Sequence, residues 1–164
     1  MELLTGTADI DDLDTFLGEL EGVGEEFGCT VQAFDARYIA GPGQLDRAVD
    51  LANRASERGE AIARKRSVEV LLYAAGRRQI NRAFEIGVSE GEREVVLVVD
   101  GEDESEGVEA LSKLVEPADW EPGERADEER IAEFYGITDA ERAATDASLA
   151  ELVCERVALL VVER

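Results

Sequence analysis

Basic side chains are concentrated in one short segment of an otherwise very acidic chain. The net charge is −22, yet residues 47–82 hold nine Arg or Lys against four Asp or Glu and are therefore net +5. Arg and Lys attract phosphate groups, and a Gln amide can bond a base edge or a backbone group. Seven residues around one predicted helix are the candidate contacts for an anionic partner: Arg64, Lys65, Arg66, Ser67, Arg77, Arg78 and Gln79.

The cations of residues 47–82 also have a purely structural interpretation, which the sequence leaves open. Arg47, Arg54 and Arg58 are spaced by seven and four residues, so they share one face of a predicted helix. Asp50 lies three or four residues from two of them and can pair with either. In this interpretation the arginines only form ion pairs with neighbouring carboxylates, of which the chain has a surplus.

Several kinds of catalysis are excluded by the residues that the chain lacks. It has no histidine, so neither a Ser-His-Asp nor a Cys-His nucleophile nor a His-ligated metal is possible. It also lacks the glycine-rich phosphate loop and the dinucleotide-binding fingerprint. We therefore expect a protein that is not an enzyme and that needs no cofactor. A hydrolase that uses carboxylates is a weakly supported alternative.

Length and composition favour one compact domain over residues 1–164, since 45% of the residues are hydrophobic. Cys29 and Cys154 lie in apolar surroundings and are predicted to be reduced core residues, and we expect a cytoplasmic protein without a secretory signal. The 39 acidic residues and only two lysines are typical of proteins from cells with molar internal salt. The apolar run 157–162 is far too short to span a bilayer.

Periodicity and turn residues predict a mixed α/β (α+β) fold, with helices packed on a small central sheet. Strands are expected at 2–7, 29–34 and 94–100, and 157–162 is expected to be a second buried strand, although a helix is left open there. Helices are expected from Asp11 or Asp12 to Gly22–Gly24, at 45–59, at 107–115, at 127–135 and from Thr138 onward. Between 67 and 87, Ser67 is predicted to cap a buried helix that ends at Gly76. A short helix with Ile80, Ala83 and Phe84 inward follows, and residues 101–107 are expected to be a solvated loop.

The segment from Ser67 to Val88, SVEVLLYAAGRRQINRAFEIGV, resembles the core signature of the Cgi/TPRKB family. Three further features follow the family pattern in the same order: the helix with Gln44, Ala48 and Ala52, the sequence Glu60-Ala-Ile-Ala, and the strand at 94–99. The likeness covers roughly residues 1–115 and the final helix, and the acidic insertions match nothing specific.

The resemblance implies a non-catalytic subunit of the KEOPS (EKC) complex, which installs threonylcarbamoyl on adenosine beside the tRNA anticodon. A subunit of this kind binds the kinase-like ATPase subunit directly and joins the catalytic Kae/TsaD-type subunit indirectly. In archaea it also captures the single-stranded CCA end of tRNA. The seven candidate residues named above then become tRNA contacts. The alternative is a purely protein-binding regulator whose arginines meet an acidic surface of the kinase-like partner.

Overall fold

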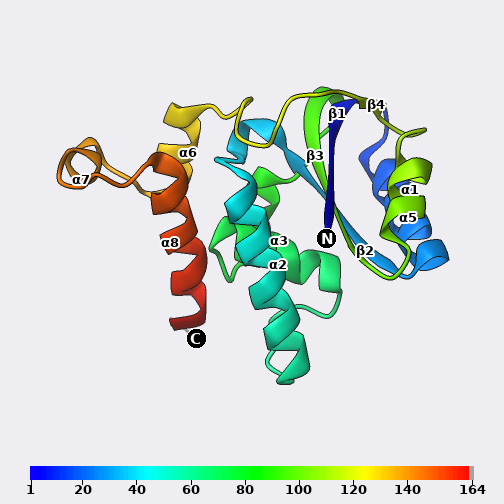
Figure 1. Cartoon of the computed structure of the whole chain (residues 1–164), viewed down its shortest axis with the longest axis horizontal. Helices are drawn as coiled ribbons and strands as arrows, with labels where there is room; N and C mark the ends of the chain where they lie inside the picture. Colours follow the sequence, from blue (N-terminus) through cyan, green and yellow to red (C-terminus); the bar gives the residue numbers. More distant parts are fainter. Residues whose placement is uncertain (163–164) are drawn as a thin grey trace.

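Four antiparallel strands form the sheet at the centre of the protein, whose computed structural model describes residues 1–162 (Figure 1). The strands are β1 (Glu2–Ile10), β2 (Cys29–Asp35), β3 (Gly91–Gly101) and β4 (Glu116–Pro117), in the order β2-β3-β1-β4. Residues 95–99 of β3 are completely buried on both faces of the sheet, as their Val-Val-Leu-Val-Val sequence predicts. Because β2 is the first strand in this order, it forms one edge of the sheet.

Helices cover both faces of the sheet in layers (Figure 1). One face carries α1 (Leu13–Phe27) and α5 (Glu104–Leu111), whose apolar residues pack against Val31, Leu97 and their neighbours. The other face carries α2 (Pro42–Glu57) and α3 (Arg66–Ala75), and α6 (Glu128–Tyr135) and α8 (Leu149–Val162) complete this second core. The predicted α+β architecture is confirmed. The short elements are η1 (Ala36–Tyr38), α4 (Ile80–Ala83), η2 (Phe84–Ile86) and α7 (Asp139–Ala143).

Helix α3 lies at the centre of the larger core, as its nearly all-apolar sequence predicts. Leu71, Leu72 and Tyr73 are at most 1% exposed. The helix ends where expected, at Gly76, whose φ of +62° is the left-handed conformation that glycine adopts without strain. At the start of α7 the Thr138 hydroxyl caps the helix by accepting a hydrogen bond of 3.0 Å from the Glu141 amide, whereas the Glu141 carboxylate pairs with Arg156.

The prediction of a strand at 157–162 is wrong, since these residues form the end of α8. Val153, Val157 and Leu160 are buried, whereas Leu159 and Val161 are 43% and 38% exposed. This spacing of four and three is the period of a helix with one face toward the core. Packing against α2 and α3 thus overrides the β-propensity of the valines.

Two glycines that were predicted to end α1 lie inside the helix, which continues to Phe27 and ends at Gly28. A Cβ atom at Gly24 would lie 2.5 Å from the carbonyl oxygen of Cys29, so this glycine permits close packing of α1 on β2. The expected loop at 101–107 is also partly wrong, because α5 begins at Glu104 and ends at Leu111, earlier than predicted. None of the helices within residues 1–162 is long and apolar enough to cross a membrane.

Candidate nucleic-acid interface

The first group of candidate cations is held in place by a buried carboxylate. Glu69 is 1% exposed, and its oxygens accept hydrogen bonds from the backbone amides of Ile62, at 2.9 and 3.0 Å, and Ala63, at 2.7 Å. Bonds of this kind to a charged acceptor are about twice as strong as neutral ones. They fix the loop that leads into α3 and so orient residues 64–66, which are all exposed.

Ser67 does not cap α3, contrary to the sequence prediction. The helix begins at Arg66, with Lys65 in the capping position and no side-chain cap, and Ser67 lies half-buried inside the first turn. The Glu69 side chain binds the amides just before the helix instead. No sequence pattern used for caps would have assigned that role to a residue inside the helix.

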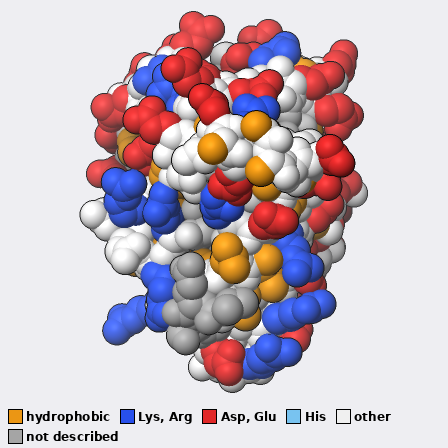
Figure 2. All heavy atoms as spheres, turned by 90° about the vertical axis from the view of Figure 1, so that its left-hand side faces the viewer, with side chains coloured by type: hydrophobic (Ala, Val, Ile, Leu, Met, Phe, Trp, Pro, Cys, Tyr) orange, Lys and Arg blue, Asp and Glu red, His pale blue; other side chains and the backbone are white. Residues whose placement is uncertain are grey.

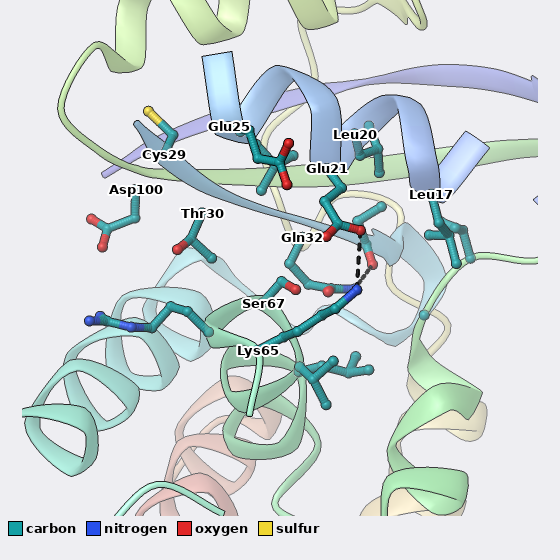
Figure 3. A pocket seen from close by; sticks show the side chains of 18 of the residues that line it. Leu17, Leu20, Glu21, Glu25, Cys29, Thr30, Gln32, Lys65, Ser67 and Asp100 are labelled. Atoms are coloured by element: carbon teal, nitrogen blue, oxygen red, sulfur yellow. Dashed lines mark hydrogen bonds and ion pairs between the residues drawn. The ribbon is translucent and has the colours of Figure 1, made fainter. Parts of the chain in front are cut away.

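The three cations of this first group make different contacts. Lys65 reaches the Glu21 carboxylate of α1 at 3.1 Å, and both side chains are more than half exposed (Figure 3). Arg66 donates to the side-chain oxygen of Asn53 on α2. Arg64 makes no ion pair with any of residues 1–162. Exposed pairs of this type contribute about 0–1 kcal/mol, so the cations remain accessible to a phosphate.

The second group lies at the other end of α3, where Arg77 has a structural role. Its guanidinium donates to the carbonyl oxygen of Phe134, and its Cζ atom lies 5.0 Å from the centre of the Phe134 ring. Arg77 is half-buried, whereas Arg78 and Gln79 are exposed. Arg77 therefore holds the turn that presents the next two side chains.

The two groups do not form one cluster. They are separated by the length of α3, and ten helical residues span about 15 Å. A ligand that contacts both groups must therefore be extended. Further exposed arginines lie on α2 (Arg47 and Arg54), directly after it (Arg58) and on α4 (Arg82). Figure 2 shows Lys and Arg gathered on the lower half of the face that carries α8, with Asp and Glu above them.

A buried network fixes the C-terminal end of α3. The Gln44 amide donates to the Tyr135 hydroxyl at 2.7 Å and to the Ala74 carbonyl at 3.0 Å, while the Tyr135 hydroxyl donates to the same carbonyl at 2.7 Å. The side-chain oxygen of Gln44 accepts from the Ala40 amide at 2.9 Å. Burial raises the pKa of Tyr135 well above its ordinary value, so the hydroxyl stays a neutral donor. Helices α2, α3 and α6 are thus joined just before the Arg77–Gln79 turn.

Two exposed apolar side chains follow the second group along the chain. Ile80 is 42% exposed and Phe84 is 57% exposed, which contradicts the prediction that both point inward. The periodicity fails because α4 contains only four residues before the chain tightens into η2, so Ala83 and Ile86 take the buried positions. Exposed apolar and aromatic groups beside cations suit unstacked bases.

The two cysteines are free and half-buried. Burial is the main reason that the pKa of each thiol is raised, and the nearby Glu104 raises that of Cys29 further. Both thiols are therefore protonated and unreactive at neutral pH. Within residues 1–162, no three acidic or cysteine side chains are arranged to hold a metal ion.

Among the described residues, the surface around α3 combines exposed cations with the exposed apolar side chains of Ile80 and Phe84. Such a combination is typical of a surface that binds another molecule. The family model described as kinase binding protein CGI-121 matches residues 16–160, and the chain belongs to this family. The resemblance identified from residues 67–88 is thereby confirmed, and the match also covers the acidic region after residue 115, which carried no specific likeness. No curated protein matches the chain.

Proposed function

We propose that this protein is a non-catalytic subunit of the KEOPS complex, which makes threonylcarbamoyladenosine in tRNA. In this role it binds the kinase-like ATPase subunit directly and is linked through it to the catalytic Kae/TsaD-type subunit, in the cytoplasm. It recruits tRNA through the single-stranded 3′ CCA end. Membership of a family described as kinase-binding supports the first contact.

The observation that carries the RNA half of the proposal is the net +5 segment on a chain of net charge −22. The fold holds this segment at both ends of α3 with dedicated contacts from Glu69 and Phe134. Arg64, Lys65, Arg66 and Ser67 supply contacts at one end. Arg78 and Gln79 supply them at the other, oriented by Arg77, with Ile80 and Phe84 available for stacking.

The test is a gel-shift titration of the isolated protein with intact tRNA and with tRNA that lacks its last three nucleotides. We expect binding to the intact tRNA and a large loss when CCA is removed. A Lys113→Glu variant is the charge-matched control, since Lys113 is an exposed cation that follows α5 on the opposite side of the sheet. Absence of binding to intact tRNA would refute the RNA half of the proposal and leave the kinase half standing.

A regulator that binds only protein is the second candidate function. It is favoured by contacts within the protein, since Lys65, Arg66 and Arg77 already bond to Glu21, Asn53 and Phe134, respectively. The same titration separates the two candidates, because only the first predicts that the isolated protein binds RNA. Pull-down with the kinase-like subunit tests the contact that both candidates share.

A further inference from the structure

A groove of about 1010 Å³ lies between α1, the edge strand β2 and the start of α3 (Figure 3). The two helices that form its walls pack on opposite faces of the sheet, and each is anchored there. Phe16 and Leu20 of α1 are buried in one core, and Leu71 and Leu72 of α3 are buried in the other. Because the walls are fixed, access to the groove depends on the side chains that cross it.

One ion pair crosses the groove. The ammonium group of Lys65, at the start of α3, lies 3.1 Å from the carboxylate of Glu21 on α1, and both residues line the groove (Figure 3). Among residues 1–162, it is the only ion pair that joins α1 to the opposite helix layer. A lysine has a flexible stem and its ammonium needs no fixed geometry, so Lys65 can leave Glu21 without movement of either helix.

The Lys65 ammonium has two competing uses. In the structure it bonds the Glu21 carboxylate, whereas in the proposed interface it contacts a phosphate. The two side chains are 63% and 51% exposed, so the carboxylate returns to water when the lysine leaves. An exposed pair of this kind shifts an equilibrium by at most about fivefold, and salt weakens it further because mobile ions screen the charges.

We propose that the Lys65–Glu21 pair is a side-chain gate over the groove, which is closed at low salt and opened by rising salt or by an anion that draws Lys65 away. This inference rests on the proposed function, because the anions that compete with Glu21 are the phosphates of a single-stranded RNA. Glu21 is then an internal competitor of the RNA, since it occupies a cation that the RNA needs. Salt therefore acts on binding in two opposite directions: it screens the phosphates, and it releases the lysine.

The reactivity of Lys65 tests the gate without RNA. The chain has only two lysines, so the exposed Lys113 is an internal standard. After limited acylation with acetic anhydride, mass spectrometry measures the ratio of modified Lys65 to modified Lys113. We expect this ratio to rise about two- to fivefold in Glu21→Gln, and to rise in the unmodified protein at molar salt. Glu25→Gln removes a carboxylate from the same wall and should leave the ratio unchanged.

Titration with a short single-stranded RNA that ends in CCA tests the effect of the gate on binding. At low salt, Glu21→Gln should bind this RNA about two- to fivefold more tightly than the unmodified protein, and at molar salt the advantage should disappear. Glu25→Gln measures the gain from the loss of any carboxylate on this wall, so the gain in Glu21→Gln must exceed it.

Three results would overturn the gate: unchanged Lys65 reactivity in Glu21→Gln, a reactivity that does not rise with salt, or equal gains in RNA affinity for the two variants. Failure of the proposed function gives a different result. If Lys65 reactivity rises as expected but no form of the protein binds RNA, the gate is supported and the RNA half of the proposed function is refuted.

Discussion

Arg77 and Arg78 are adjacent in sequence but have different surroundings. The Arg77 guanidinium bonds the Phe134 carbonyl and lies over its ring, whereas Arg78 is exposed. Arg77→Ala should lower the free energy of unfolding by about 1–3 kcal/mol, because it leaves a half-buried acceptor unpaired and removes a cation–π contact. Arg78→Glu should weaken tRNA binding, because Arg78 is an exposed cation of the proposed interface.

Thermal melting and gel-shift titration of the two variants check this prediction. Lys113→Glu controls for the change in net charge in the binding experiment. Equal melting temperatures for Arg77→Ala and the unmodified protein would contradict the structural role of Arg77. Unchanged tRNA affinity of Arg78→Glu, and of the double variant Lys65→Glu, Arg66→Glu, would count against the RNA interface.

Glu69 is a second residue whose buried position makes a sharp prediction. Glu69→Gln keeps the shape of the side chain but replaces one carboxylate oxygen with a donor that faces the amides of Ile62 and Ala63. We expect a loss of about 1–3 kcal/mol in the free energy of unfolding and faster hydrogen exchange at these two amides. Glu57→Gln, an exposed acid at the end of α2, is the comparison. Unaltered exchange at both amides would show that the loop does not need the charge.

At the scale of elements, α3 lies at the centre of the core, so we expect substitutions in this helix to cause the largest loss in the free energy of unfolding. Replacing Leu71 or Leu72 with Ala should cost about 2–5 kcal/mol, since both side chains are at most 1% exposed and the space cannot refill. Leu159→Ala on α8 is the matched control, because Leu159 is 43% exposed. Chemical denaturation measures the difference. Similar midpoints for all three variants would mean that α3 does not lie in the core.

The elements that could be predicted are those in which local pattern and burial agree. The five apolar residues of β3 are buried on both faces, and the apolar positions of α2 meet the core with helical spacing. Prediction failed where packing overrides local preference. The valines of α8 favour a strand by propensity but pack on α2 and α3 as a helix, and Gly24 is a contact point inside α1 although glycine commonly ends helices.

The whole surface shows what the sequence could and could not predict about the candidate site. The excess of cations in residues 47–82 is visible in the sequence because charge needs no structure to be counted. The separation of the site into two groups, the inward role of Arg77 and the exposure of Phe84 depend on contacts between distant segments. The groove beside β2 also escaped prediction, because the position of a strand at the sheet edge follows from pairing over long sequence distances.

Charge at the scale of the molecule leads to a prediction about salt. At molar salt the Debye length is about 3 Å, so attraction between this surface and phosphates contributes little. Binding then depends on short-range contacts, which the unstacked bases at a CCA end can make with Arg78, Gln79 and Phe84. We expect removal of CCA to abolish binding at molar salt, whereas residual binding at low salt should not depend on sequence. Titrations across salt with both RNAs measure this, and equal affinity at molar salt would refute it.

The sheet order also has a consequence for the synthesis of the chain. Strand β1 pairs with β3 over its full length, from Glu2 opposite Val99 to Ile10 opposite Gly91. The first strand to leave the ribosome therefore waits for its main partner until residue 101 has emerged. At about 5–20 residues per second, this delay lasts roughly 5–20 s. During that interval the apolar residues of β1 and β2 have no β3 to cover them, so a nascent chain stalled before β3 is complete should be a strong substrate for chaperones.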